Sequence, residues 1–357
     1  MHTLAPGALA EYGWSDRVLA LFNQILGTLP PGAGPGGEIA PARVVRVERA
    51  RCVAAFPDGA ERLLRAPRLP AVGDWVLARE GDLHQVLERW SALVRVDPDP
   101  TGVGTQVLAA NVDLVLIAVP ADRVNTARAD REIAIAWDSG ARPVVVLTKA
   151  DLAGPGRVEE LGRRLVGVEV VAASTVSGLG IGELRALLVP SRTAVFIGPS
   201  GAGKSSLANS LIGSAGNLPV GQVRKADGRG RHTTTWRELV KVPTGGVIID
   251  TPGLRSLGLT RDATASGAFA DIEELAEYCR FSDCHHTGEP GCAVALAVAA
   301  GDLARERLDS FVKLQREIAA ERRRTDPLAR QAERRLWKER TKLTRSYDKR
   351  RPHPPSQ

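Results

Sequence analysis

The sequence has no long apolar segment that could cross a membrane. Its longest run of small apolar residues, Ala293–Ala300, is far shorter than the roughly 20 residues that a spanning helix requires. The N-terminus also lacks the basic and then apolar pattern of a secretory signal, because Glu11 and Asp16 interrupt it. We therefore expect a cytoplasmic protein that works without a membrane.

Cysteine is scarce, and its distribution argues against a disulfide framework. The 357 residues contain four cysteines, and three of them fall within residues 279–292. With a histidine of the same segment they form a Cys₃His set, which is typical of a closed, tetrahedral structural zinc site. The predicted ligands of one Zn²⁺ ion are three thiolates and one imidazole, from Cys279, Cys284, Cys292 and either His285 or His286.

Negative charge is in the minority, and the imbalance is confined to one end of the chain. The net charge is +7, while residues 301–357 alone hold 17 Lys and Arg against 9 Asp and Glu. An excess of this sign favours a polyanionic partner, most simply a nucleic acid. A solvated helical tail without such a partner explains the same charges, so composition leaves both interpretations open.

The first hundred residues contain short β-rich runs and turn signals. A short amphipathic helix is expected over residues 8–26, and the Pro/Gly-rich stretch 27–37 is typical of a flexible linker. Five or so short strands within about sixty residues then predict a small barrel, of which the OB-fold is a reasonable type. The expected strands are Arg43–Val47, Arg51–Phe56, Trp75–Ala78, His84–Leu87 and Leu93–Val96.

Apolar strands alternate with helices in the middle of the chain. The expected strands are residues 113–119, 143–147, 168–172, 194–197 and 247–249. Their alternation with helices predicts a parallel sheet that is covered on both faces, which is the α/β class. After about residue 262 the sequence predicts helices alone.

A glycine-rich loop connects a predicted strand to a predicted helix and fits the phosphate-binding pattern GxxxxGK[ST]. The backbone N–H groups of such a loop and the helix N-terminus bind phosphate oxygens. Lys204 is expected to neutralise the β- and γ-phosphates, and Ser205 to ligate Mg²⁺. The residues expected to contact nucleotide here are Gly198, Pro199, Ser200, Gly201, Ala202, Gly203, Lys204, Ser205 and Ser206.

A second switch signal follows the last buried strand. Asp250 precedes Thr-Pro-Gly253, so its carboxylate is expected to hold Mg²⁺ while the N–H of Gly253 meets the γ-phosphate. Leu254 stands where many GTPases have a glutamine that orients water. Because leucine cannot do this, we expect slow intrinsic hydrolysis that leaves room for a stimulating partner.

A first switch signal lies between the phosphate loop and Asp250. Residues 225–235 are basic and glycine-rich, which is typical of a mobile switch loop. One threonine at the end of this loop is expected to reach Mg²⁺ when the γ-phosphate is present. Thr233 and Thr234 are the candidates given this role, and the sequence leaves open which of residues 233–235 binds the ion. His232 either orients or deprotonates water, or it contacts phosphate or RNA.

The best match to a base-recognition motif is Thr148-Lys149-Ala150-Asp151, at the end of a predicted strand. The carboxylate of Asp151 can accept hydrogen bonds from guanine N1–H and from the exocyclic amine, an arrangement that adenine does not match. Thr148 replaces the usual asparagine and keeps one of its polar contacts. A simple turn at the end of a strand is the alternative interpretation.

The order of these motifs is their most informative property. In most GTPases the base-recognition motifs follow the phosphate loop, whereas here the motif ending at Asp151 precedes it by about fifty residues. Ser174 and Thr175, the second candidate contact to the base, also precede the loop. We therefore predict a circularly permuted GTPase domain, in which the second switch leads directly into the C-terminal part of the chain.

Taken together, these features resemble the RsgA (YjeQ) family of circularly permuted GTPases that depend on the small ribosomal subunit. The resemblance covers roughly residues 40–325. It includes Ala109-Ala110-Asn111-Val112-Asp113, the segment Gly-Arg-His-Thr-Thr, Asp-Thr-Pro-Gly-x-Arg255 and the Cys₃His segment 279–292, called the zinc knuckle below. It implies an OB-fold that binds ribosomal RNA, a central GTPase and a C-terminal helical zinc domain. It also implies a late role in maturing the 30S subunit, with subunit-stimulated hydrolysis of GTP linked to release.

The resemblance further implies ligands, partners and domains. It favours His286 over His285 as the zinc ligand, and it implies the 30S subunit with its 16S rRNA, GTP and GDP as partners, with Mg²⁺ accompanying the nucleotide. We also expect a monomer. The expected domains are residues 1–39 (helix and linker), 40–98 (OB-fold barrel), 105–262 (permuted GTPase), 263–325 (zinc-knuckle helices) and 326–357 (basic tail).

Two other functions are compatible with these residues. Thr148 leaves room for a P-loop ATPase or a small-molecule kinase, which a comparison of GTP and ATP binding would separate. A non-catalytic RNA-binding module of barrel and zinc knuckle, with a vestigial nucleotide site, is the other. The intact Lys204, Ser205 and Asp250 argue against it, and a turnover assay with ribosomal subunits decides the question.

Overall fold

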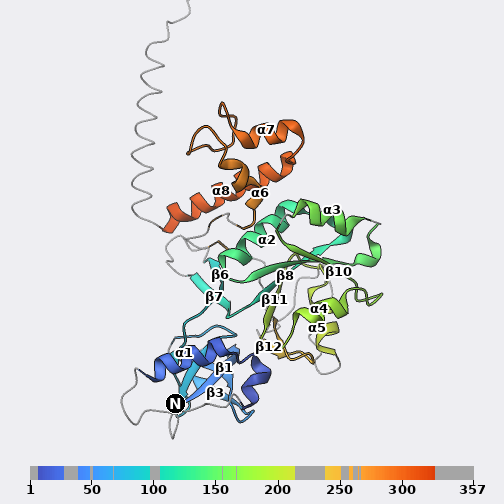
Figure 1. Cartoon of the computed structure of the whole chain (residues 1–357). Helices are drawn as coiled ribbons and strands as arrows, with labels where there is room; N and C mark the ends of the chain where they lie inside the picture. The colour runs from blue at the N-terminus through green and yellow to red at the C-terminus, as the bar shows by residue number, and fades with distance from the viewer. Residues whose placement is uncertain are drawn as a thin grey trace, which may run out of the picture.

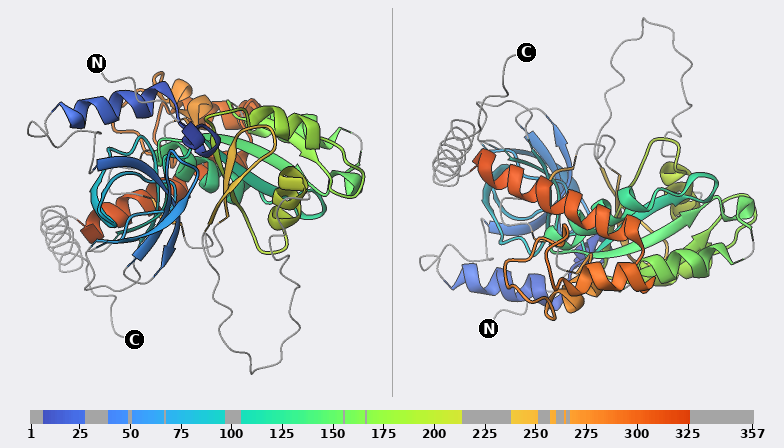
Figure 2. Two further views of the ribbon diagram at one scale, coloured as in Figure 1. Left: turned by 90° about the horizontal axis from the view of Figure 1, so that it is seen from below. Right: turned by 90° about the horizontal axis from the view of Figure 1, so that it is seen from above.

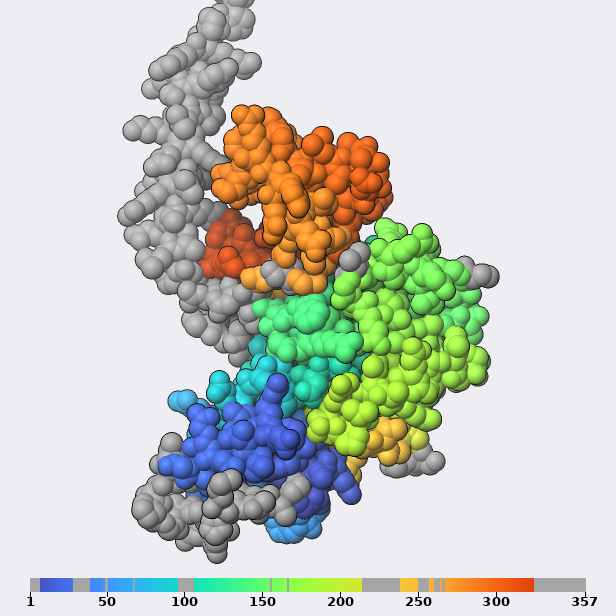
Figure 3. Space-filling model, in the orientation of Figure 1, coloured from blue at the N-terminus to red at the C-terminus, as the bar shows by residue number. Residues whose placement is uncertain are grey.

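The computed structural model shows three bodies in chain order: an N-terminal barrel, a central α/β body and a C-terminal group of helices (Figures 1 and 3). It describes residues 7–27, 39–48, 51–66, 68–96, 105–154, 156–165, 167–213, 238–250, 257–259, 264 and 267–325. The predicted switch residues His232, Thr233, Thr234 and Gly253 lie outside these ranges. No helix within the described ranges is long and apolar enough to cross a membrane.

Five strands close into the N-terminal barrel: β1 (Ile39–Glu48), β2 (Arg51–Ala55), β3 (Glu61–Arg65), β4 (Trp75–Arg79) and β5 (Asp82–Val86). Their order is β1-β2-β3-β5-β4, and β4 pairs back with β1. The pairs are antiparallel except for one parallel bridge, Arg65↔Asp82, between β3 and β5. Ala42, Val44, Cys52, Leu64 and Val76 are among the small and branched side chains of its core. The left view of Figure 2 shows the ring of strands, and the predicted OB-like barrel is confirmed.

The fifth strand of the barrel is not the one expected from the sequence. Residues 92–96 form β6 (Ala92–Val96), which pairs with β7 (Thr105–Ala110) in a separate two-stranded sheet. The barrel instead uses β3, whose sequence Glu-Arg-Leu-Leu-Arg has one buried residue, Leu64. Four exposed positions out of five hide the alternation that reveals a half-buried strand.

The expected N-terminal helix is broken by a glycine. A 3₁₀ turn, η1 (Gly7–Tyr12), precedes α1 (Asp16–Leu26). Gly13 lies between them with φ +88°, and a Cβ there would clash with the guanidinium of Arg43. The bend lets both pieces bury apolar side chains in the main core, including Val18 and Phe22 of α1.

The central body contains a six-stranded section of sheet in the order β10-β9-β8-β11-β13-β12. The strands are β8 (Leu114–Pro120), β9 (Arg142–Thr148), β10 (Glu169–Ala173), β11 (Thr193–Ile197), β12 (Glu238–Lys241) and β13 (Val247–Asp250). Only β12 is antiparallel to its neighbour in this section. The helices are α2 (Thr126–Asp138), α3 (Arg157–Arg164), α4 (Ile181–Leu187) and α5 (Lys204–Ile212), with 3₁₀ turns η2 (Ala121–Arg123) and η3 (Ala150–Leu152).

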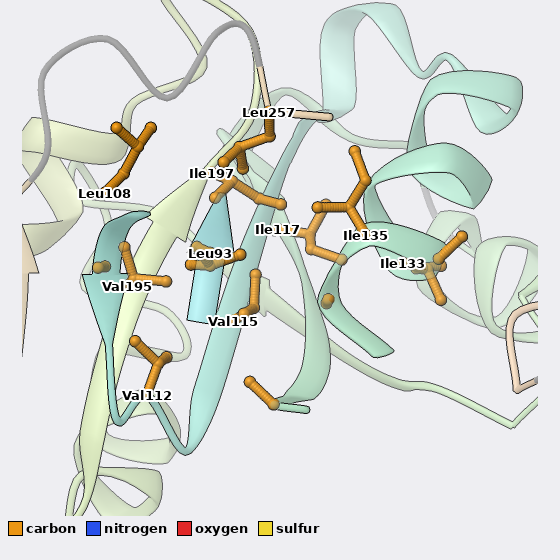
Figure 4. Close-up of a cluster of buried hydrophobic side chains, with 14 of the residues drawn as sticks. Leu93, Leu108, Val112, Val115, Ile117, Ile133, Ile135, Val195, Ile197 and Leu257 are labelled. Carbon is orange, nitrogen blue, oxygen red and sulfur yellow. The ribbon is translucent and has the colours of Figure 1, made fainter. Parts of the chain in front are cut away.

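Alternate strand residues face two separate apolar clusters. Val115 and Ile117 of β8 pack with Ile133 and Ile135 of α2, as Figure 4 shows. Leu114 and Leu116 of the same strand, with residues of α4 and α5, belong to the other cluster. The sheet is therefore covered on both faces, as the continuous apolar strands predicted.

Strand order confirms the circular permutation. β11 comes after β8, β9 and β10 in the chain, yet it lies between β8 and β13 in the sheet. Because these strands are parallel, the C-terminal ends of β8, β9, β10, β11 and β13 all lie at one edge of the sheet. That edge holds every predicted nucleotide motif in the described ranges.

The C-terminal helices are α6 (Ala270–Ala276), α7 (Ala293–Ala300) and α8 (Arg305–Thr325). The right view of Figure 2 shows α8 lying across the molecule, and its buried residues share the main core with α2. At the other end β12 meets the barrel through one bridge, Arg46↔Glu238. The boundaries of the five predicted domains stay a prediction.

Candidate nucleotide site and metal centre

The phosphate loop has the backbone that its glycines require. Gly198, Gly201 and Gly203 have φ values of +132°, +74° and +86°, which L side chains rarely adopt. At Gly198 a Cβ would lie 2.6 Å from the carbonyl oxygen of Ala118, so a side chain does not fit. The loop leads directly into α5, whose first residue is Lys204. The N-terminus of this helix therefore faces the loop, as an anion-binding site requires.

The Lys204 side chain folds over the loop. Its Nζ donates hydrogen bonds to the carbonyl oxygens of Gly198, at 2.9 Å, and Pro199, at 2.7 Å. These carbonyls hold the ammonium group beside the place where phosphate oxygens would lie. Ser205 and Ser206 are half-buried in the first turn of α5.

The base motif touches the phosphate loop through Thr148. Thr148 ends β9 and is 1% exposed. A Cβ built on Gly203 would lie 3.9 Å from the Cβ of Thr148. Thr148 Oγ1 is buried without a hydrogen-bond partner in the described part of the chain. A buried hydroxyl without a partner is costly, so a bound group that reached this oxygen would gain a hydrogen bond.

A short network fixes the acidic residue of the motif. Ser174 Oγ donates a 2.5 Å hydrogen bond to Asp151 Oδ1. Ser174 Oγ in turn accepts hydrogen bonds from the backbone N–H groups of Val176 and Ser177, at 3.1 and 3.2 Å. Ser174 is buried, whereas Asp151 and Thr175 are exposed. The network thus orients a carboxylate that faces solvent and is accessible to a base.

Lys149 has an unusual conformation. Its φ is +55°, in the left-handed region, and its Nζ lies 3.3 Å from Asp122 Oδ2. This conformation lets the chain leave β9 and enter η3, which contains Ala150 and Asp151. The side chain of Lys149 therefore reaches from the end of β9 to the residues that follow β8.

Two residues that follow β8 at the same edge, Asp122 and Arg123, were not predicted from the sequence. Asp122 pairs with Lys149, and a Cβ on Gly201 would lie 3.7 Å from the guanidinium of Arg123. On α2 the pKa of Glu132 is raised, because its burial outweighs the opposing effects of Arg128, at 2.8 Å, and of the more distant charge of Lys204. A polar residue directly after a buried parallel strand is the signal that would have found Asp122 and Arg123.

The metal ligands come together as predicted. One ligand atom each from Cys279, Cys284, His286 and Cys292 lies within 4.8 Å of the others. His286 Nδ1 lies 3.6 Å from Cys279 Sγ and 3.4 Å from Cys292 Sγ, and the two sulfurs are 3.9 Å apart. Tetrahedral ligands at about 2.3 Å from zinc lie about 3.7 Å from one another, so this donor set fits that ion.

Local structure prepares the cluster for a metal. Cys292 precedes α7, and its sulfur accepts a hydrogen bond from Ala295 N. Burial lowers the pKa of His286, which favours the neutral imidazole that binds metals. Glu289 accepts hydrogen bonds from the backbone N–H groups of His285 and Thr287, which braces the turn. His285 is exposed, so the structure selects His286 for the cluster.

Comparison with known proteins places the chain in a family. A family model described as RsgA GTPase matches residues 86–260. A protein of Streptomyces coelicolor named "Small ribosomal subunit biogenesis GTPase RsgA" is 42% identical over 351 residues, which are 93% of this chain and 93% of that protein. A relative of the same name from Streptomyces avermitilis is 44% identical, over 92% and 91% of the two chains.

The chain belongs to the RsgA GTPase family. The crystal structure of YjeQ from Thermotoga maritima matches with a TM-score of 0.60 and 27% identity, over 78% of this chain and 98% of that one. The structure of YloQ, described as a circularly permuted GTPase, matches with a TM-score of 0.57 and shows the fold alone at 23% identity. RsgA membership accounts for the motif order, because the permuted fold carries the base motif ahead of the phosphate loop.

The RsgA site is assembled from distant parts of the chain. The structure brings the residues after β9, β10 and β11 together, and Asp250 ends β13 beside β11 at the same edge. The remaining predicted contacts, His232, Thr233, Thr234 and Gly253, belong to ranges outside the described residues.

Proposed function

We propose that this chain is a GTPase that acts in the maturation of the small ribosomal subunit. The observation that carries the proposal is the meeting of Thr148 and Gly203, which joins a base motif to a phosphate loop at one sheet edge. Relatives that cover more than nine tenths of the chain carry the name small ribosomal subunit biogenesis GTPase.

Each nucleotide motif has a proposed role. The backbone of residues 198–203 and the N-terminus of α5 bind the phosphates, and Lys204 neutralises their charge. Ser205 and Asp250 would hold Mg²⁺, which supplies charge neutralisation at the β- and γ-phosphate oxygens when it is bound. Asp151, oriented by Ser174, accepts the guanine N1–H and amine. The buried hydroxyl of Thr148 is placed to complete its hydrogen bonding when nucleotide is present.

Hydrolysis itself is proposed to depend on the subunit. Leu254 offers no group that orients water, and His232 is the proposed residue of the first switch for this role. Thr233 or Thr234 would order with the γ-phosphate, as switch threonines do in other GTPases. Docking on the 30S subunit would then raise turnover, and the GDP state would release.

The Cys₃His cluster is proposed to hold one structural Zn²⁺ ion. All four donors come from the protein, so the coordination sphere is closed and has no position for a substrate. The ion would fix the knuckle that joins α6 to α7 beside α8.

Turnover with and without ribosomal subunits tests the proposal. We expect purified 30S subunits to raise GTP hydrolysis by the parent protein, with 50S subunits as the control. Lys204→Ala should abolish the activity, because catalysis of phosphoryl transfer is mostly positioning and charge stabilisation. A parent protein that hydrolyses no GTP with either subunit would contradict the proposal.

Base choice is tested separately. Competition of labelled GTP with ATP should show a strong preference for GTP, because a site built to hydrogen-bond a group rejects ligands that lack it. Asp151→Asn should lower guanine affinity and shift the preference towards xanthine nucleotides. Equal binding of ATP and GTP would favour the ATPase or kinase alternative that Thr148 leaves open.

The barrel and the basic C-terminus are proposed to bind RNA, and the proposed partner is the 16S rRNA of the 30S subunit. The protein is proposed to do this in the cytoplasm and as a monomer. Sedimentation with 30S subunits should weaken steeply with salt, and each lost phosphate contact should lower the slope by roughly 0.7–0.9. Deleting residues 327–357 should flatten this dependence and leave GTP affinity of the free protein unchanged. If the deletion left the salt dependence of 30S binding unchanged, residues 327–357 would not contact the RNA.

A further inference from the structure

A hollow lies where the GTPase body meets the C-terminal helices. A cavity of about 410 Å³ is lined by α2, α8, Ile197 at the end of β11, and Leu257. Ile197 immediately precedes the phosphate loop, and Leu257 is the first described residue after Asp250. Beside the apolar contacts that α8 makes with the main core, polar contacts around this space therefore hold this part of the junction.

One arginine makes the contacts that bridge the hollow. Arg131 of α2 forms a bidentate pair with Glu317 of α8, with its Nη2 2.7 Å and its Nε 3.0 Å from the carboxylate oxygens. The same Nη2 donates a hydrogen bond to the carbonyl oxygen of Leu257 at 3.1 Å. A planar guanidinium has five donors in a fixed fork, so it can pair with a carboxylate through two bonds and still donate to a carbonyl, a fixed geometry that the ammonium group of lysine does not provide.

Leu257 connects this arginine to the nucleotide site. Its side chain is buried beside Ile197, as Figure 4 shows. Its backbone bridges Arg95 of β6, and the next residue, Gly258, donates to Val94 O at 3.3 Å. The chain leaving the predicted second switch is therefore fixed between the strand of the phosphate loop, β6 and Arg131.

A second set of ion pairs holds α8 near its N-terminal end. Arg307 is 7% exposed, and it pairs with Asp130 of α2 at 2.5 Å and with Asp271 of α6 at 2.9 Å. Asp130 and Arg131 are neighbours on α2, whereas their partners on α8 are ten residues apart, or about 15 Å along a helix. The enclosed pair at Arg307 can serve as a pivot, and the half-exposed pair at Glu317 lies at the end that can move.

From these contacts we propose that Arg131 is a positioning residue for GTP hydrolysis, which ties the end of the second switch to the docking of α8. This inference rests on the proposed GTPase function. When α8 is docked, Arg131 holds the Leu257 carbonyl and so fixes the position of Leu257, seven residues after Asp250. When α8 is displaced by a partner, Glu317 leaves, and Arg131 loses the anion that holds its fork in place. The docking of α8 and the position of Leu257 at the end of the second switch therefore influence each other.

Nucleotide affinity and turnover separate this role from a merely structural one. Arg131→Ala should lower the turnover number for GTP about fivefold or more, while GDP affinity changes less than about twofold. Arg131→Lys should restore only part of the rate, because it lacks the fork. Arg142→Ala is the matched control, since Arg142 pairs with Glu169 at the same 2.7 Å within the GTPase sheet. This control should keep the parent rate.

A charge swap tests the contact with Leu257. In Arg131→Glu/Glu317→Arg the ion pair between α2 and α8 can re-form, yet residue 131 has no donor for the carbonyl. We expect the swap to restore thermal stability lost in Arg131→Glu, and turnover to stay low. Parent turnover in the swap, or in Arg131→Ala, would overturn the inference while leaving the GTPase function intact. A parent protein that hydrolyses no GTP would remove the proposed function itself, and this inference with it.

Discussion

The two junctions of the GTPase body differ in the polar contacts that hold them. On the barrel side Arg43 of β1 is fully buried, donates to Thr193 Oγ1 at 2.7 Å and to the carbonyl of Tyr12, and lies over the Trp75 ring. Trp14 packs edge-on against the same ring, at 5.4 Å between centroids. On the C-terminal side the half-exposed pair Arg131–Glu317 lines a cavity of about 410 Å³, and a second, enclosed pair joins Arg307 to Asp130.

This difference indicates which junction can respond to a nucleotide. Close-packed interiors resist small displacements, and a buried charge cannot leave its partners without a large penalty. A half-exposed pair such as Arg131–Glu317 can separate into water at little cost. We therefore expect the barrel to move as one body with the GTPase sheet, and the C-terminal helices to be the part that shifts.

Removal of zinc should have the largest effect, and it should be confined to the C-terminal side. Structural zinc supplies roughly 10–16 kcal/mol of apparent binding free energy in finger peptides. Chelation should therefore melt residues near 275–300 while the barrel and the GTPase sheet stay folded. Metal analysis and circular dichroism of the chelated protein measure this. Absence of zinc from protein purified without chelator would contradict the assignment of the Cys₃His cluster.

Replacement of Arg307 should be the most damaging point mutation at the C-terminal junction. Arg307→Met leaves Asp130 and Asp271 without their cation, and breaking a buried pair costs about 3–5 kcal/mol. Denaturant unfolding should show this loss in the free energy of unfolding. Arg305→Met is the control, because its pair with Asp309 is exposed. A loss below about 1 kcal/mol for Arg307→Met would mean that the pivot is not enclosed.

The same pair gives a pH dependence. Burial raises the pKa of Asp130 to about 6, although Arg307 opposes the shift. The unfolded value is about 3.9, so between these values the folded state holds more protons, and the free energy of unfolding falls as pH rises through the window. The penalty of Arg307→Met should accordingly shrink from pH 8 to pH 5, and an Asp130→Asn background should abolish that trend.

Asn111 tests the barrel side. Its φ is +56°, its Nδ2 donates to Gly73 O at 3.0 Å, and its Oδ1 accepts from Trp90 N at 3.3 Å. Asn111→Ala should cost about 2–3 kcal/mol, from lost buried hydrogen bonds and a strained backbone. Asn111→Gly removes the bonds without the strain, so it should cost about 1 kcal/mol less. Equal losses in thermal or denaturant unfolding would mean that the left-handed backbone contributes nothing.

Arg43→Met should have the smallest effect, although Arg43 is the more buried of the two junction arginines. Burial lowers the pKa of Arg43 to about 10, against the opposing charges of Asp113 and Asp74. Its hydrogen-bond acceptors within the described residues are a carbonyl and a hydroxyl oxygen, and neither is a carboxylate. An apolar side chain of similar length should therefore cost only about 1 kcal/mol. A loss as large as that of Arg307→Met would break the contrast between the two junctions.

The local parts of the fold were predictable from the sequence, and the long-range contacts were not. Continuous apolar strands such as residues 143–147 and the spacing from Cys279 to Cys292 carry their structure in neighbouring residues. The barrel strand at Leu64 was missed because one buried residue among charged ones shows no period. β6 was assigned to the barrel because its sequence does not reveal that its partner is β7, the next strand along the chain.

The candidate site divides in the same way. The motifs at Thr148, Asp151 and Gly198–Ser205 could be predicted because glycine, lysine and carboxylate at fixed spacing have few other uses. Arg131 and Glu317 could not, since two ordinary charged residues of amphipathic helices acquire a role only when α8 crosses α2. No property of either helix alone distinguishes this pair from a solvated one.

Hydrogen exchange in two nucleotide states tests most directly whether the C-terminal junction reads the nucleotide. The parent protein would be compared in GDP and in a non-hydrolysable GTP analogue, with peptides covering α2, α8 and strands β1 to β5. We predict that protection of α8 (Arg305–Thr325) and the adjacent face of α2 differs between the two states, while the barrel peptides exchange alike. A difference confined to the barrel, or none in α8, would contradict the account.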